Sequence, residues 1–204
     1  MDARRRAIIA VAREIFVSRG YAATSMSEVA AAVGGSKATL YNYFRSKEEL
    51  FAALMAETCQ ERAAALFDPL PPIGVGRSVR ESLIELGLSL MRFLLVDEVI
   101  AIHRLVVAEC GRFPELGRMF YEAGPQRGEL RFTEYFEAAM SAGRVPRADA
   151  RMVGQRLKDL VMSDVYMKRL WGVTGDLADE DLRAHVERSV DIFLRAFGAP
   201  RPAA

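Results

Sequence analysis

Apolar residues recur every three or four positions along most of this chain, and that helical spacing limits the folds open to it. The last such stretch shows the pattern best, because its apolar residues fall on one helix face: Leu182, Val186, Val190, Phe193 and Phe197. No alternation of apolar and polar residues is long enough to indicate a β-strand. We therefore expect an all-α fold.

Serines and glycines divide the first part of the chain into short helices. Ser25 and Ser46 are each followed three residues later by glutamate, which is the capping-box pattern that begins a helix. Ser36 is a further candidate N-cap, and Gly34-Gly35 ends the helix before it. Two short helices between Ser25 and Ser46 are thus expected to pack with the helix that precedes Gly20.

After the helix-breaking stretch DPLPPIGVG at residues 68–76, the helical segments become longer. They are expected near residues 77–95, 97–110, 114–123, 125–142, 147–171 and 178–197. The sequence thus predicts a small N-terminal unit at residues 1–47, a connecting helix at 48–67 and a larger helical body at 75–200.

Charge and cysteine usage limit the partners and the compartment. Residues 1–55 carry eight basic and five acidic side chains, whereas the rest of the chain is slightly acidic. A mildly basic end is compatible with nucleic acid. The two cysteines lie in no C-x-x-C pattern, and no apolar run reaches the length of a membrane span. These features predict a cytoplasmic protein with no membrane partner.

The stretch GGSKATLYNYFRSK, residues 34–47, admits three functional interpretations. A phosphate loop requires Gly-Lys-Ser/Thr after a strand, but the order here is Gly-Gly-Ser-Lys and no strand precedes it. Tyr43 and Lys47 have the spacing of a dehydrogenase tyrosine–lysine pair, yet Ser46 is expected to break the helix between them. No Gly-rich dinucleotide-binding turn lies upstream either. The third interpretation is a helix-turn-helix that binds DNA.

The helical wheel of this stretch favours the third interpretation. Leu40 and Phe44 share one sector and would form a buried seam. The opposite side is small and polar, with cations and hydroxyls at its rim, and such a surface suits a major groove. We expect Thr39 and Asn42 at base edges, Ala38 at a thymine methyl, and Lys37, Tyr41, Tyr43 and Lys47 at phosphates. The alternative is a solvated amphipathic helix whose tyrosines only cover the core.

Residues 16–54 resemble the DNA-binding domain of the tetracycline-repressor (TetR) family of transcriptional regulators. The resemblance rests on G-Y-x-x-T at residues 20–24, a capped A-x-x-x-G turn, S-K-x-T-L-Y-x-Y-F at 36–44 and S-K-E-x-L at 46–50. It implies DNA contacts by Thr24, Ser25, Ser36, Lys37, Thr39, Tyr41, Asn42, Tyr43 and Lys47. Two positions depart from the family pattern, because glycine is frequent where Ala38 stands and histidine is common where Tyr43 stands. Both departures bear on which bases are read.

The body resembles AefR-like members of the same family, less specifically, through RLVVAECGRFPELGRMFYEAG at residues 104–124. This resemblance implies a homodimer formed through the last two long helices and a pocket for a small-molecule effector. The interface candidates are Leu182, Val186, Val190, Phe193 and Phe197, although a core within one chain would equally explain them. The pocket candidates are Phe93, His103, Phe120, Met162 and Tyr166, although methionine and aromatic residues at helical spacing are usually core.

The sequence contains no recognised metal-binding or catalytic pattern. Its two histidines, His103 and His185, lie far apart and outside any H-E-x-x-H motif, and no G-x-S-x-G is present. We therefore expect no metal, no cofactor and no enzyme activity. The resemblance implies a repressor that binds a double-stranded DNA operator and is released by a small hydrophobic or amphipathic ligand. The competing hypothesis is a helical small-molecule-binding protein or enzyme whose helix-turn-helix is vestigial.

Overall fold

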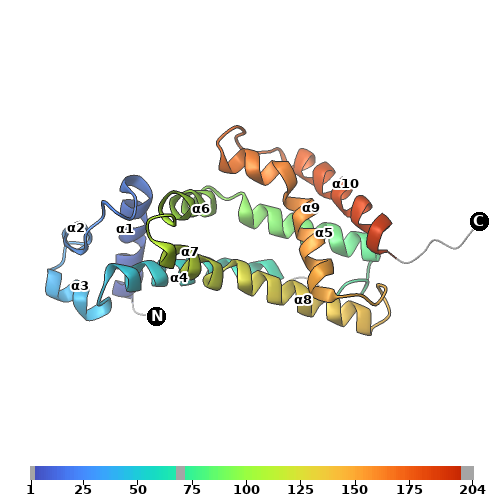
Figure 1. Ribbon diagram of the computed structural model, residues 1–204, viewed down its shortest axis with the longest axis horizontal. Helices are drawn as coiled ribbons and strands as arrows, with labels where there is room; N and C mark the ends of the chain where they lie inside the picture. Colours follow the sequence, from blue (N-terminus) through green and yellow to red (C-terminus); the bar gives the residue numbers. More distant parts are fainter. Residues whose placement is uncertain (1–2, 68–71, 199–204) are drawn as a thin grey trace, which may run out of the picture. The chain divides into compact units, whose positions relative to one another are not determined.

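The computed structural model describes residues 3–67 and 72–198, and every regular element within these ranges is a helix, which confirms the predicted all-α class. The elements in chain order are α1 (Ala3–Arg19), α2 (Met26–Ala32), α3 (Lys37–Tyr43), α4 (Lys47–Phe67), α5 (Val79–Leu94), α6 (Asp97–Glu109), α7 (Pro114–Ala123), α8 (Pro125–Ser141), α9 (Ala150–Leu170) and α10 (Asp179–Phe197) (Figure 1). Residues 199–200 of the predicted body lie outside the described residues.

Side-chain caps set the first helix boundaries. The Ser25 hydroxyl accepts the Glu28 N–H at 3.3 Å, and the Glu28 carboxylate accepts the Ser25 N–H at 2.8 Å, so the predicted capping box is present. These bonds hold the pKa of Glu28 below its usual range, with the Ser25 amide as the largest cause. At the start of α4, the Ser46 hydroxyl accepts the Glu49 N–H at 3.2 Å. The Glu49 carboxylate accepts the Arg45 N–H at 2.7 Å, so this second box closes one residue earlier than the pattern predicts.

Two caps that the sequence analysis did not use explain why the body helices begin later than expected. Ser78 and Glu81 form a complete capping box, so α5 begins at Val79 instead of residue 77. The Asp149 carboxylate accepts the Met152 N–H at 3.1 Å, and α9 therefore begins at Ala150 instead of residue 147. Both serine and aspartate are favoured N-caps because their side chains satisfy an otherwise unpaired amide.

The described helices group into two compact units, and each has its own apolar core. The first unit contains α1, α2, α3, α4 up to Glu61, α6 from Ala101, and α7. Its core joins residues that are far apart in the sequence: Phe16 and Phe51 pack edge to face, and Leu105 and Leu116 belong to the same cluster. Residues 101–125 thus pack with the N-terminal helices. The domain boundaries expected from the sequence, at residues 47, 67 and 75, stay a prediction.

The second unit is built on α10, which packs against α5 and α9 (Figure 1). The apolar stripe of α10 faces these helices: Leu182, Val186, Val190 and Phe193 are at most 4% exposed in the single chain. Phe197 is half-buried against the same cluster. The four buried side chains have no surface to offer a second copy. Their assignment to a dimer interface is therefore corrected, and they form the core of one chain.

At Gly87, α5 lies close to both α9 and α10. A Cβ atom at this position would lie 2.7 Å from Val186 Cγ1 and 3.3 Å from Val161 Cγ2. Both valines are completely buried, and β-branched side chains have few alternative rotamers. Only glycine therefore fits here without displacing the core.

Replacing Gly87 with alanine should lower the free energy of unfolding by about 1–3 kcal/mol, because the added methyl group overpacks the core. Chemical denaturation monitored by circular dichroism measures the change. Gly128 in α8 is the matched control, since a Cβ there meets nothing within 4 Å. Gly128→Ala should raise the stability by about 0.5–1 kcal/mol through helix propensity. Stabilisation by both substitutions would contradict the close packing at Gly87.

Candidate nucleic-acid interface

The helix α3 is held to its unit by the two residues that the wheel predicts. Leu40 is 2% exposed and Phe44 is fully buried, which confirms the seam. Phe44 is also covered by the Arg5 guanidinium, which lies 4.9 Å from the ring centroid. Since α3 packs against α2, the side of α3 away from Leu40 faces solvent. Tyr41 and Asn42 are exposed on it.

The start of α3 is ordered by its own hydroxyl groups. The Ser36 hydroxyl accepts the Thr39 N–H at 3.0 Å, and the two hydroxyl oxygens lie 2.9 Å apart. Thr39 is half-buried as a result, while Lys37 and Ala38 are exposed beside it. The exposed surface of α3 therefore combines one cation, one methyl group and several hydroxyl and amide groups.

The loop between α1 and α2 is centred on Tyr21, which is almost completely buried. Its ring stacks on Phe16 at 5.5 Å and meets Phe113 edge to face at 5.2 Å. Its hydroxyl donates to Glu48 Oε1 at 3.0 Å. Burial is the largest cause that raises the pKa of Tyr21 well above its usual value, and the Glu48 carboxylate is the second. The phenol therefore stays neutral.

Lys47 fastens this loop to α4. Its Nζ donates to the Tyr21 carbonyl at 2.8 Å and to the Thr24 carbonyl at 3.0 Å, and it lies 4.3 Å from the centre of the Tyr21 ring. Thr24 is 2% exposed, and its hydroxyl donates to the Gly20 carbonyl at 2.8 Å. The structure thus gives Lys47 and Thr24 bonds within the chain, whereas their phosphate contacts stay predictions.

A residue that the sequence analysis missed, Glu109 at the end of α6, also holds the loop. Its Oε1 accepts the Ala22 N–H at 3.1 Å and would lie 2.8 Å from a Cβ atom at Gly20. Gly20 has a φ of +84°, which glycine adopts without strain. No sequence pattern could have found this contact, because the two partners are 87 positions apart.

The predicted DNA-contacting residues differ in how accessible they are. The exposed ones are Ser25, Ser36, Lys37, Ala38, Tyr41 and Asn42, and the half-buried ones are Thr39, Tyr43 and Lys47. Thr24 is the buried member of the set. Apart from Ser25, Thr24 and Lys47, all of them lie on α3 or its cap, so the structure brings most of the set together on one short helix.

The two competing interpretations of residues 34–47 find no support in the geometry. The Gly-Gly turn follows α2 and not a strand. Tyr43 ends α3 and Lys47 begins α4, so they do not share the continuous helix that a dehydrogenase pair requires. Among the residues that the structure describes, no three His, Cys, Asp or Glu side chains are placed to hold a metal ion. Within the same residues, no helix is long and apolar enough to cross a membrane.

The five predicted pocket residues fall in both units. His103 and Phe120 lie in the first unit, where their rings meet edge to face at 4.5 Å. Burial lowers the pKa of His103 to about 4, so this imidazole is neutral at neutral pH. Phe93, Met162 and Tyr166 lie in the second unit and pack on its core. Their joint role in a pocket stays a prediction.

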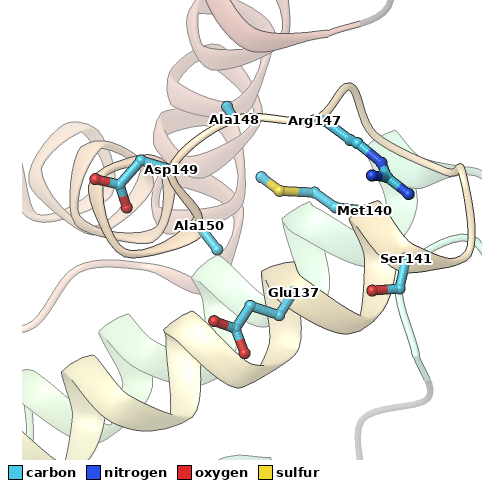
Figure 2. Close-up of a pocket in the computed structure, with 7 residues that line it drawn as sticks. All are labelled: Glu137, Met140, Ser141, Arg147, Ala148, Asp149 and Ala150. Carbon is cyan, nitrogen blue, oxygen red and sulfur yellow. The ribbon is translucent and has the colours of Figure 1, made fainter.

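The second unit contains a hollow that the sequence analysis did not anticipate. It lies between the end of α8 and the start of α9, has a volume of about 560 Å³ and is open to solvent. Figure 2 shows the carboxylates of Glu137 and Asp149 and the guanidinium of Arg147 spread around it, with Met140 between them. The charged groups are of both signs and point in different directions, so the hollow offers no focused site for one charged ligand.

Two family models match separate parts of the chain. Residues 8–54 match the model of bacterial regulatory proteins of the tetR family, and residues 81–199 match the C-terminal domain of AefR-like transcriptional repressors. The transcriptional regulator UidR of Escherichia coli strain K12 is 29% identical over 184 residues, which are 87% of this chain and 83% of UidR.

Solved structures agree with these matches. The flavonoid-responsive regulator FrrA is 31% identical, with a TM-score of 0.84 over 97% of this chain and 98% of FrrA. A TetR family transcriptional regulator from Pseudomonas syringae pv. tomato is 28% identical, with a TM-score of 0.74 over 98% of this chain and 100% of its own.

The bonds of Lys47 predict a structural role that Lys37 lacks. Lys47→Met should lower the free energy of unfolding by about 1–3 kcal/mol, because the Tyr21 and Thr24 carbonyls lose a charged donor. Lys37→Met is the matched control and should change stability by less than about 0.5 kcal/mol, since Lys37 is exposed. Urea denaturation measures both. Equal stability of the two variants would contradict the structural role of Lys47.

Proposed function

The chain belongs to the tetR family of helix-turn-helix transcriptional regulators, and on that premise we propose that it is a repressor whose α3 binds an operator in double-stranded DNA. The observation that carries the proposal is the division of α3 into a buried seam, Leu40 and Phe44, and an exposed polar side. A helix held in this way can enter a major groove without unfolding its own unit.

The exposed groups of α3 suit two kinds of DNA contact. Asn42 carries an amide that can bond an adenine edge in two places, and the Ala38 methyl can pack on a thymine methyl. Lys37 and Tyr41 can bond phosphates, which position the protein but carry no sequence information. Ser25 is exposed at the start of α2 and is proposed as a further phosphate contact. Thr39 is proposed at a base edge, where it would use its own hydroxyl, which is hydrogen-bonded to the Ser36 hydroxyl at 2.9 Å.

We propose that the protein acts as a homodimer, so that two copies of α3 bind the halves of a two-fold symmetric operator. Since the stripe of α10 is core, the surface that pairs two copies is the exposed side of α10, where Ile192 is 53% exposed. The centres of homodimer interfaces are more apolar than the rest of the protein surface, and Ile192 is a large aliphatic side chain that α10 leaves exposed. The helices proposed to pair are the last two long ones, as the family resemblance implies.

The effector is proposed to be a small hydrophobic or amphipathic molecule bound by the body. The similar protein FrrA is named as flavonoid-responsive, and a flavonoid is an amphipathic aromatic compound. Phe93, Met162 and Tyr166 provide aromatic and polarisable side chains suited to such a ligand. A ligand can release the operator only by as much as its affinities for the two conformations differ. No enzymatic role is proposed.

The competing function is a helical small-molecule-binding protein or enzyme whose helix-turn-helix is vestigial. A vestigial DNA-binding unit has no need to keep a polar, accessible surface on α3, whereas this chain keeps one over an intact seam. DNA binding by the purified protein separates the two functions.

Two substitutions on α3 should affect operator binding in different ways. Lys37→Met should weaken binding to all DNA sequences alike and reduce the slope of log K against log salt by about one, because one phosphate contact is lost. Asn42→Ala should cost about 1–3 kcal/mol on the preferred sequence and little on others. Fluorescence anisotropy at several salt concentrations measures both. Lys158→Met, on α9, is the charge-matched control and should bind as the wild type does. Identical effects of Lys37→Met and Asn42→Ala on every sequence would contradict these roles.

The proposed dimer surface predicts a change of oligomeric state. Ile192→Glu should shift the protein from dimer to monomer, because a charge is costly to bury at the centre of an interface. Sedimentation velocity measures the distribution. Val107→Glu is the control, since Val107 is 67% exposed on α6, outside the proposed surface. A dimer that Ile192→Glu leaves intact would show that another surface pairs the two copies.

A further inference from the structure

The helix α9 is interrupted at Ser163. Its backbone has a φ of 38° and a ψ of −142°, and among the described residues it is the non-glycine residue with positive φ. This conformation is close to the first central position of a type II′ turn, which glycine normally occupies. Figure 1 shows α9 changing direction along its length. A residue with a Cβ atom keeps such a conformation only where its surroundings hold it there.

The neighbouring helix α10 supplies groups that hold this interruption. The Ser189 hydroxyl donates to the Leu160 carbonyl at 3.0 Å, and His185 Nε2 lies 2.8 Å from the Val161 carbonyl. A carbonyl oxygen only accepts, so Nε2 carries the proton. In a continuous helix these two carbonyls would accept from the amides four residues later, which lie beyond Ser163. Side chains of α10 thus provide donors where the backbone of α9 is interrupted.

Ser189 has a second acceptor at the same distance. Its hydroxyl oxygen lies 3.0 Å from the Leu160 carbonyl and 3.0 Å from the His185 carbonyl in its own helix. One hydroxyl proton serves one of them at a time. Ser189 is only 5% exposed. If the Leu160 carbonyl accepted a hydrogen bond from the backbone of α9 instead, the Ser189 hydroxyl would still donate to the His185 carbonyl. His185 is half-buried, so water can replace its partner.

We propose that Ser163 is a hinge between two forms of α9: an interrupted form that Ser189 and His185 hold, and a continuous form in which α9 pairs its own carbonyls. Ser189 keeps an acceptor in both forms and water can replace the Val161 carbonyl at His185, so the loss of the two bonds is offset, while the strained backbone at Ser163 opposes the interrupted form. Such a balance is the condition for a two-state element that a ligand can shift.

The part of α9 beyond the hinge is tied to two other segments through Arg169. Its guanidinium pairs with Asp97, the first residue of α6, and lies 2.9 Å from Asp176 Oδ1 in the loop after α9. Tyr166, one of the proposed effector contacts, also lies beyond the hinge and is buried. The last residue of α6 is Glu109, which holds the loop before α2. The regulatory part of the proposal is that a change at Ser163 acts on operator binding through α6; this step rests on the proposed function.

Alanine and glycine substitutions, compared at Ser163 and at an ordinary position of α9, test whether the folded protein contains the interrupted form. At Gln155, an ordinary position of α9, the alanine variant should have a folded-to-unfolded ratio about fivefold above that of the glycine variant. At Ser163 the order should reverse, with Ser163→Gly about fivefold above Ser163→Ala, because glycine adopts positive φ freely. Urea denaturation measures the four variants. The same order at both positions would overturn the proposal.

Hydrogen exchange tests whether the two forms interconvert. Ser163→Ala should slow exchange of the Asp164 and Val165 amides by about tenfold, because alanine favours the continuous helix. Ser189→Ala should slow the same amides, since it removes a donor that holds the interrupted form. Arg188→Ala, exposed on α10, is the control and should change neither amide. Unchanged exchange in both Ser163→Ala and Ser189→Ala would show a fixed bend and overturn the hinge.

Operator affinity tests the regulatory consequence separately. Ser163→Gly and Ser163→Ala should shift the Kd for the operator in opposite directions, by at least about threefold each. If both bind as the wild type does, the hinge does not control the operator and that step is overturned. If the wild type binds no DNA, the proposed function fails, while the stability and exchange results still decide the hinge itself.

Discussion

The burial of Leu40 and Phe44 is the constraint on which the functional account depends. These two side chains fix α3 by one side, and the remaining sides must then face solvent or a partner. Because α3 has only seven residues, its orientation comes from this packing and not from its own stability. Whatever α3 recognises, it does so with the small polar side that this seam leaves exposed.

The loop before α2 connects that seam to the rest of its unit. Lys47 binds it from α4, Glu109 binds it from α6, and the Tyr21 ring packs beneath it. The Lys47 and Glu109 contacts join segments that are distant in the sequence, so the position of α2 and α3 depends on helices that lie outside the helix-turn-helix. A substitution in α4 or α6 can therefore displace α2 and α3 without touching a proposed DNA-contacting residue.

Local sequence patterns predicted the helix caps and the buried seam, because these features depend on residues that are close together in the sequence. The capping box of Ser25, the cap of Ser36 and the seam of α3 follow from spacing alone, and the structure contains them. Periodicity cannot say what covers an apolar face, so it left the stripe of α10 open between a second copy and the core of one chain. In the structure, α5 and α9 of the same chain cover it.

Polar contacts made across long sequence separations were also beyond prediction. The spacing of Lys47 suggested an outward cation, but its ammonium group meets two carbonyls that only the folded chain brings near. The bend at Ser163 has no local signal either, since serine does not favour positive φ and the groups that hold it come from α10.

A hydroxyl-radical footprint of the wild-type protein on the DNA upstream of its own gene tests sequence-specific binding by α3 most directly. We expect two protected segments related by two-fold symmetry, with protection that weakens steeply as salt rises. Protection that is uniform along the DNA, or absent at low salt, would contradict sequence-specific binding by α3.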